Sequence, residues 1–429
     1  MSICMFWQLY DSVIPLILKN TFKINDTISG AVMALDNVIA LFLLPLFGNL
    51  SDKCNTRIGR RMPFIIVGTL VSVILMTFLP VIDNIYADNP TGGLKVGFIL
   101  VLAVLLIAMG TYRSPAVALM PDVTPKPFRS RGNAVINLMG AIGIILYLIA
   151  TAFIYSAERT AGLLHVDYQP LFIIVQVIMV LSVILLYKTI NEPALSAKCL
   201  EYEKAHPEEN LEAIDETGET TVPKEVKKSL AFILISIAFW YMGYNAVSTA
   251  ITKFFQVEWN MSLGSAALCV TVAMAVSVIA FIPVGELSSR IGRKKTIIAG
   301  TIVLAACFAA TAVVSFAARG FSPVLYVIFA FVGISWAAIN VNSLPMVLEM
   351  CKGSEVGKYT GYYYTFSMSA QIVTPILSGA LLEYAGYWTL FPYAAFFVAL
   401  SAFTMTQVKY GDNKPKMPKN RLEFYDTED

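Results

Sequence analysis

The chain has 429 residues, of which 57% are hydrophobic and 14% are charged, and its mean hydropathy is +0.68. Soluble globular proteins are about 45–50% apolar and about 25% charged, so this composition excludes an ordinary soluble fold and favours a chain surrounded by lipid. The net charge of +2 is too small, and the basic residues are too dispersed, to indicate nucleic acid as a partner.

Apolar runs long enough to cross a bilayer, which takes about 20 residues, recur along the whole chain. They predict helices over residues 3–18, 28–50, 63–83, 95–119, 133–156, 170–190, 229–252, 263–287, 295–316, 323–347, 360–384 and 388–408. Residues 191–228 are charged and poor in apolar side chains, which is typical of a flexible linker. We therefore expect an all-α membrane protein of twelve transmembrane helices. It divides into a six-helix bundle over 1–190, the linker over 191–228, a second bundle over 229–408 and a tail over 409–429.

The first predicted span is short. Residues 1–18 would rise about 27 Å as a helix, and no basic residue precedes them. Two interpretations stay open: the first helix is truncated because the natural start lies upstream or is misassigned, or it is a short helix without tilt.

Lysine and arginine are distributed unevenly between the two sets of connections. The connections after the even-numbered helices, together with the tail, carry 24 of the 31 basic residues, and the opposite set carries 6. Since cytoplasmic loops are enriched in Lys and Arg, both termini are predicted to be cytoplasmic. No organellar signal is evident, so a bacterial-type plasma membrane is the default location of this multi-pass chain.

A short sequence recurs after the second helix of each half. GNLSDKCNTRIGRRMPF at 48–64 and GELSSRIGRKKTII at 285–298 share G-x-L-S followed by R-I-G-R, displaced by 237 residues at the glycine and 233 at the arginine. Two halves of equal topology related in this way indicate a transporter built from parallel repeats around a central cleft.

These two loops resemble the signature of the major facilitator superfamily, in which glycines permit close helix packing and arginines form ion pairs that close the cytoplasmic side. The matching positions, which the resemblance assigns to a cytoplasmic gate, are Gly48, Asp52, Gly59, Arg60, Arg61, Gly285, Arg290, Gly292, Arg293 and Lys294. The second copy departs from the signature, because Ser289 replaces the acid and Glu286 offers a carboxylate one residue after the glycine. Simple topological anchoring would explain the arginines but not the matched glycines.

The ends of the fourth and tenth helices are related in the same way. Each has a proline, then an acid, Asp122 or Glu349, and then a basic residue three positions before a glycine, as in Arg129–Gly132. We expect Asp122 and Glu349 to accept ion pairs from the loop arginines of their own halves, and Arg129 to belong to the same gate. Such pairs are suited to being broken and re-formed during alternating access.

Further stretches resemble a narrower group, the sucrose and related glycoside–proton symporters, which adjoin the glycoside–pentoside–hexuronide cation symporters. The resemblance is carried by residues 6–18, 34–52, 59–68, 112–122, 336–350 and 359–379. It implies sugar–proton symport by rocking of the two halves around a cavity at mid-membrane.

Polar side chains within the predicted spans are the candidates for contact with a solute, because such groups normally face a cavity or a partner. Carboxylates and amides suit sugar hydroxyls, and aromatic faces suit the C–H surface of the ring. The predicted substrate-binding set is Gln8, Asp11, Tyr244, Asn245, Trp336, Asn340, Asn342 and Gln371. For the asparagines, hydrogen bonding between helices is the alternative, and for the aromatic residues it is packing or an interfacial belt.

Coupling to protons needs a carboxylate that gains and loses a charged partner. Asp36 and Arg113 are the predicted proton-coupling residues, with Asp11 as a second choice. A structural ion pair between Asp36 and Arg113 is the alternative. In sodium-using relatives an acid directly precedes the proline of the second helix, whereas Leu44 precedes Pro45 here, so a sodium site does not transfer. The acid that plant sucrose carriers hold in the fourth helix is missing between Val96 and Tyr112.

The sequence thus predicts a monomeric secondary transporter in the lipid bilayer, with a sugar and a proton as its small-molecule partners. No cofactor or metal is expected, since the six cysteines form no CxxC pair and His165 and His206 lie far apart. Three rivals stay open: an exporter of amphipathic compounds or other metabolites, a membrane enzyme, and a sensor. The last two are disfavoured, because no HExxH or GxSxG motif is present and the longest soluble stretch is the linker.

Overall fold

The computed structural model describes residues 1–125, 129–205, 224–318, 322–350 and 356–411. Their secondary structure is helical, with one isolated β-bridge between Thr56 and Gly59. The all-α prediction is therefore confirmed for this part of the chain.

The first half of the chain forms six long helices and two short ones. They are α1 (Ser2–Leu16), which continues through the π-helical turn η1 (Ile17–Thr21), α2 (Asp26–Asp52), α3 (Met62–Asp88), α4 (Gly92–Val123), α5 (Arg129–Ile154), the short α6 (Ala157–Thr160), α7 (Gln169–Thr189) and α8 (Glu192–Ala205). The second half forms α9 (Lys224–Trp259), α10 (Leu263–Ile291), α11 (Arg293–Ala318), α12 (Val324–Leu348), α13 (Val356–Tyr384), the 3₁₀ turn η5 (Tyr387–Thr389) and α14 (Leu390–Thr406).

Eleven helices in the described ranges are long and apolar enough to cross a bilayer. The exception among the twelve predicted spans is α1, which has 15 residues and lengthens only through η1. Each of the twelve predicted spans corresponds to a helix, and their apolar surfaces suit a lipid environment.

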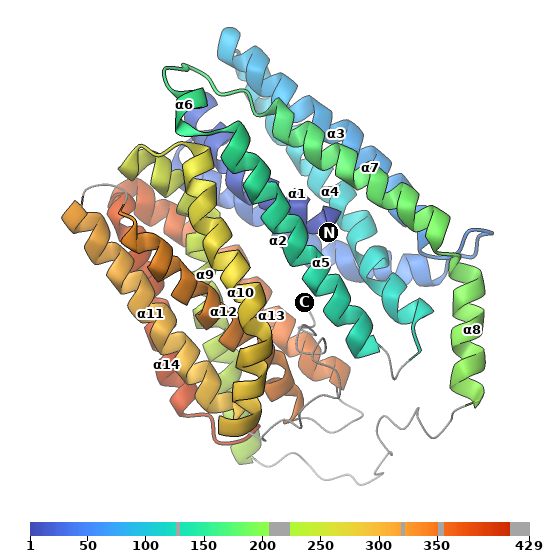
Figure 1. Cartoon of the computed structure of the whole chain (residues 1–429). Coiled ribbons are helices and arrows are strands. Elements are labelled where there is room, and N and C mark those ends of the chain that lie inside the picture. The colour runs from blue at the N-terminus through green and yellow to red at the C-terminus, as the bar shows by residue number, and fades with distance from the viewer. Residues whose placement is uncertain (126–128, 206–223, 319–321, 351–355, 412–429) are drawn as a thin grey trace.

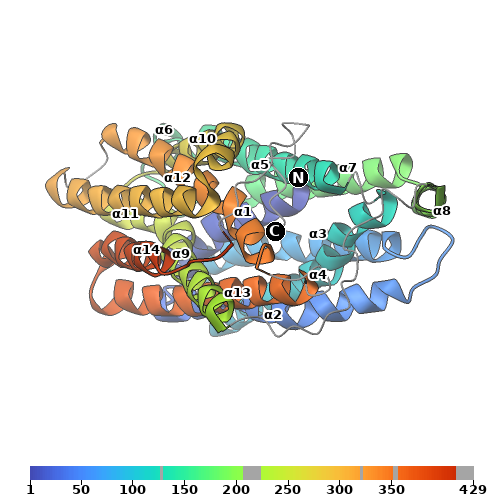
Figure 2. The same ribbon diagram turned by 90° about the horizontal axis from the view of Figure 1, so that it is seen from below.

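The helices form two bundles that lie side by side (Figure 1). The N-terminal bundle contains α1 to α5 and α7, and the C-terminal bundle contains α9 to α14. Helix α2 packs against α13 and α5 packs against α10 (Figures 1 and 2), and α1 also packs against α9, so these helix pairs join the bundles. This is the two-bundle arrangement that the internal repeat predicts.

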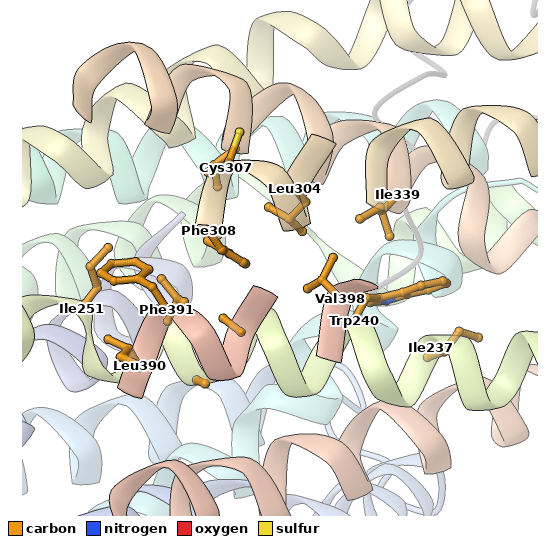
Figure 3. Packing of buried hydrophobic residues seen from close by; sticks show 14 of the residues in the cluster. Ile237, Trp240, Ile251, Leu304, Cys307, Phe308, Ile339, Leu390, Phe391 and Val398 are labelled. Atoms are coloured by element: carbon orange, nitrogen blue, oxygen red, sulfur yellow. The ribbon is translucent and has the colours of Figure 1, made fainter. Parts of the chain in front are cut away.

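Each bundle has its own apolar core. In the C-terminal bundle, Trp240 of α9 lies beside Val398 of α14, and Phe308 of α11 lies near Phe391 of α14 (Figure 3). Trp240 is fully buried, which fixes α9 and α14 as one packed pair. Helix α9, which also carries polar residues toward the other bundle, is held rigidly by this packing.

The segment predicted to be a flexible linker begins with a helix. Residues 192–205 form α8, which packs against α4, and α9 begins at Lys224 rather than at 229. Residues 206–223 lie outside the described ranges. The prediction of a flexible linker was wrong for residues 192–205. The Glu192 carboxylate at their start accepts backbone hydrogen bonds from residues 60–62, and the composition of the segment gives no sign of such contacts.

Candidate functional site

A cavity lies between α1 of the N-terminal bundle and helices α9 to α12 of the C-terminal bundle. The space between its lining atoms amounts to about 600 Å³, a figure that includes open solvent. It is lined by Gln8, Asp11, Tyr244, Val247, Ser248, Ile251, Thr252, Val270, Ala273, Met274, Phe308, Phe329 and Val332.

One side of this cavity is polar. Gln8 and Asp11 are three residues apart on α1, and Tyr244, Ser248 and Thr252 follow one another at four-residue spacing on α9. Both spacings place side chains on one face of a helix, so an amide, a carboxylate and three hydroxyls converge on the same space. Together they can donate and accept hydrogen bonds to a ligand that carries several hydroxyls.

An aromatic pair stands beside this polar side. The rings of Tyr244 and Trp336 are stacked with centroids 3.6 Å apart and planes 6° from parallel, and Tyr241 meets Trp336 edge-on at 5.8 Å. Flat aromatic surfaces of this kind pack against the C–H face of a sugar ring. The structure stacks Trp336 on Tyr244, but of the two only Tyr244 lines the cavity.

The other four amide residues of the predicted set lie elsewhere. Asn245, Asn340, Asn342 and Gln371 are not among the residues that line the cavity. Asn342 is 1% exposed and donates to the Ala338 carbonyl at 2.9 Å, which is a bond within α12. For Asn342 this bond is neither a contact with the cavity nor the bond between helices that the sequence analysis gave as the alternative.

Ser248 and Thr252 line the cavity but are missed by the sequence argument. A serine or threonine in an apolar helix commonly bonds its own backbone, as Ser248 does with the Asn245 carbonyl at 3.2 Å, so it carries no signal of its own. The four-residue spacing from Tyr244 was the available clue.

The three charges predicted inside the N-terminal spans lie in one neighbourhood. Asp36 is within electrostatic range of both Arg113 and Asp11. Its carboxylate accepts a hydrogen bond from Asn37 at 2.8 Å, while the Arg113 guanidinium lies 5.3 Å from the centre of the Trp7 ring. Within the described ranges Asp36 and Arg113 form no ion pair. Arg113 instead makes a cation–π contact with Trp7.

The first copy of the repeated loop is tied to α4. Asp122 pairs with Arg60 at 2.7 Å and with Nε of Arg61 at 2.8 Å, and Arg61 also pairs with Asp52 and donates to the Gly48 carbonyl at 3.2 Å. Burial lowers the pKa of Arg61, but hydrogen bonding and charge from Asp122 and Asp52 outweigh it and leave that pKa above its ordinary value. Asp122 therefore accepts the ion pairs that the repeat predicts.

Glu192, at the start of α8, holds the same loop from the other side. Its carboxylate accepts backbone N–H bonds from Arg60, Arg61 and Met62 at 2.9–3.2 Å, and it is 2% exposed. Gly59 has φ +119°, and a Cβ there would lie 2.1 Å from a Glu192 carboxylate oxygen. Glycine is thus required by both conformation and space. The sequence argument missed Glu192, whose only signal is an acid directly after a span.

The second copy of the loop is simpler. Arg293 pairs with Glu349, as the repeat predicts, and Gly292 has φ +98° between α10 and α11. Lys294 donates to the Thr406 carbonyl at 3.1 Å. The remaining predicted gate residues of this half lie in the last turns of α10, with Gly285 buried, Glu286 half-buried and Arg290 exposed. The Arg129 side chain lies outside the described part of the structure.

The sequence profile of the Major Facilitator Superfamily matches residues 1–257 and 233–424. The chain belongs to this superfamily. It is therefore a multi-pass membrane protein of a transporter fold.

Several curated relatives of this facilitator are named as sugar carriers. It is 32% identical to "Sucrose transport protein SUC3" of Arabidopsis thaliana over 158 residues, which are 34% of this chain and 26% of that one. It is 31% identical to the human "Proton-associated sugar transporter A" over 137 residues, which are 30% of this chain and 18% of that one. The chain thus matches about a quarter or less of the length of these two relatives.

The fold of the facilitator is shared with solved transporters. The xylose transporter XylE from E. coli in an inward-open conformation has a TM-score of 0.69 at 13% identity, covering 99% of this chain and 96% of that one. A bacterial homologue of the iron transporter ferroportin in an inward-facing state has a TM-score of 0.69 at 11% identity, with 95% and 96% covered. These neighbours are transporters, not enzymes, and at such identities they show the fold alone.

Proposed function

We propose that this facilitator is a secondary active transporter that carries a sugar, in the class of disaccharides or other glycosides, together with a proton by alternating access. The observation that carries the proposal is the cavity, where the Asp11 carboxylate, the Gln8 amide and the Tyr244 ring face one space. The names of the partly matching relatives support the same class of solute.

Within this proposal the residues have separate roles. Asp11 and Gln8 accept and donate bonds to sugar hydroxyls, and Tyr244, which is supported by its stack on Trp336, packs against the ring. Asp36 is the proton-coupling carboxylate, since it lies in range of Arg113 without being paired to it, so its charge can be compensated in one state and not in another. The loop pairs of Arg60, Arg61 and Arg293 belong to the cytoplasmic gate.

The apolar side of the cavity supports a second candidate, an exporter of amphipathic compounds. Helices α10 to α12 contribute Val270, Met274, Phe308, Phe329 and Val332, which offer no hydrogen bonds. A solute with one polar and one apolar end would fit both sides of such a cavity.

Ligand-induced thermal stabilisation of the purified protein separates these candidates. A panel of mono- and disaccharides is compared with amphipathic cations, in the wild type and in Asp11→Asn. We expect a saccharide to raise the unfolding temperature and Asp11→Asn to reduce that shift. Stabilisation by amphipathic compounds alone, with all saccharides silent, would favour the exporter.

A further inference from the structure

The end of the molecule opposite the repeated loops is closed by polar contacts between the bundles. We name it the outer end, because the Lys/Arg distribution predicts that it faces outside. Here Asp26 of α2 pairs with Lys253 of α9 at 2.9 Å, and both are almost completely buried, at 2% and 5% side-chain exposure. Asp26 belongs to the N-terminal bundle and Lys253 to the C-terminal bundle, so the ion pair crosses the interface between the bundles.

Asp26 has further partners at the same place. Its second carboxylate oxygen accepts a bond from Lys19 at 2.9 Å and one from the Tyr387 hydroxyl at 2.8 Å. The carboxylate is therefore saturated by two cations and one hydroxyl, and two of these three partners come from the C-terminal bundle. We call Asp26, Lys253, Lys19 and Tyr387 the outer network.

The backbones around the outer network approach too closely for side chains. A Cβ at Gly379 of α13 would lie 2.4 Å from the Asp26 carbonyl oxygen, and one at Gly30 would lie 2.0 Å from the Pro375 carbonyl oxygen. The Gly264 N–H also donates to the Tyr155 carbonyl across the α5–α10 pair at 2.9 Å. No solute can pass between α2 and α13 at this end until the two helices separate.

From this geometry we infer that Asp26 and Lys253 form an ion-pair gate that holds the outer end closed and must break each time the cavity opens to that side. A buried pair is a poor source of fold stability, because desolvation offsets its attraction, but it specifies one arrangement of the parts that it joins. Opening admits water, which solvates both charges once they separate. The pair therefore controls the balance between two states of the carrier.

The gate and the cavity share one helix. Ser248 and Thr252 of α9 line the cavity, whereas Thr249 and Lys253, each one residue further, border the small pocket that also contains Asp26. A solute that binds to the cavity face of α9 therefore contacts the helix that carries Lys253. Binding of a solute in the cavity and breakage of the Asp26–Lys253 pair are therefore coupled through α9.

The test measures the distance between the bundles at the outer end and needs no substrate, so it can fail independently of the proposed sugar. Spin labels are placed on cysteines at Leu164 and Tyr384, which are 107% and 80% exposed, in a background without the native cysteines. Pulsed electron paramagnetic resonance then gives the distance distribution in reconstituted protein.

Three gate variants and one control are compared. Asp26→Asn leaves Lys253 and Lys19 unpaired, so we expect the ratio of long to short distances to rise at least tenfold. Lys253→Gln should give a smaller rise, since Lys19 still compensates the charge of Asp26 and the Tyr387 hydroxyl still bonds Asp26 across the interface. The double variant should shift less than Asp26→Asn alone, because it removes one of the two unpaired cations. Asp88→Asn, which removes an exposed acid at the end of α3 on the same side of the molecule, should leave the distances unchanged.

Thermal unfolding of each labelled variant checks that it is folded, and Asp26→Glu, which keeps the charge, should retain the short distance. Unchanged distances in both single variants would overturn the gate. An equal shift in Asp88→Asn would also overturn it, because the effect would then not belong to the pair.

Discussion

The contact between Glu192 and the first repeated loop gives a prediction whose size follows from the structure. Replacing Glu192 by Ala removes an acceptor shared by three backbone N–H groups, at Arg60, Arg61 and Met62. These groups form the start of α3, where they have no partner within the helix. The carboxylate also interacts favourably with the positive end of the helix dipole.

The expected cost can be bounded. A hydrogen bond to a charged group contributes about 1.5–3 kcal/mol, but these three share one carboxylate, and water replaces part of the loss. We therefore expect about 3 kcal/mol for Glu192→Ala and about half of that for Glu192→Gln, whose amide oxygen can still accept. At about 1.4 kcal/mol per tenfold change, local opening should become about a hundredfold and about tenfold more frequent.

Hydrogen exchange of the 60–62 backbone, followed by mass spectrometry on the purified protein, measures this opening. Glu201→Gln is the matched control, because Glu201 is an exposed acid on the same helix α8. We expect faster exchange in the order Ala, then Gln, with the control like the wild type. Exchange at 60–62 that is the same in Glu192→Ala and the wild type would refute the proposed role of α8.

The remaining predictions concern the cavity, the cytoplasmic gate and the topology. Asp11→Asn should weaken sugar binding about tenfold, since it loses a charged acceptor, and unchanged affinity by calorimetry would remove Asp11 from the site. Arg60→Ala should strongly reduce transport in proteoliposomes while the protein stays folded, because it breaks a pair with Asp122; normal transport would leave the loop as a topology anchor only. Cysteines introduced into 191–228 should react with impermeant reagents only after cells are opened, and reaction in intact cells would reverse the predicted orientation.

Hydropathy and the internal repeat were enough to predict the two-bundle fold and part of the loop chemistry. A long apolar segment that crosses lipid must satisfy its own backbone hydrogen bonds, which a helix does. The positions of the helices therefore follow from the hydropathy of the sequence. Arg61 with Asp122, and Arg293 with Glu349, could be paired in advance because each lies at the same place in its half. Symmetry supplied here the spatial information that a single sequence otherwise lacks.

Contacts without a repeat could not be predicted. Lys253 was assigned to a connection after residue 252, whereas α9 extends to Trp259 and buries it against Asp26 of the other bundle. Glu192 has no partner near in sequence, since its bonds reach back 130 to 132 residues. The asparagine at 342 has the residue type of a ligand-binding group, yet its side chain bonds its own helix. Residue type shows what a side chain can do, and packing decides where it does it.

The central claim is proton-coupled sugar transport with Asp36 as the coupling carboxylate. The most direct measurement compares uphill sugar uptake driven by a proton gradient with energy-independent counterflow, in proteoliposomes of the wild type and of Asp36→Asn. The account predicts that the wild type performs both, and that Asp36→Asn loses uphill uptake but retains counterflow, because an amide still fills the site and can form hydrogen bonds. Full uphill uptake by Asp36→Asn, or a sodium gradient replacing the proton gradient in the wild type, would contradict it.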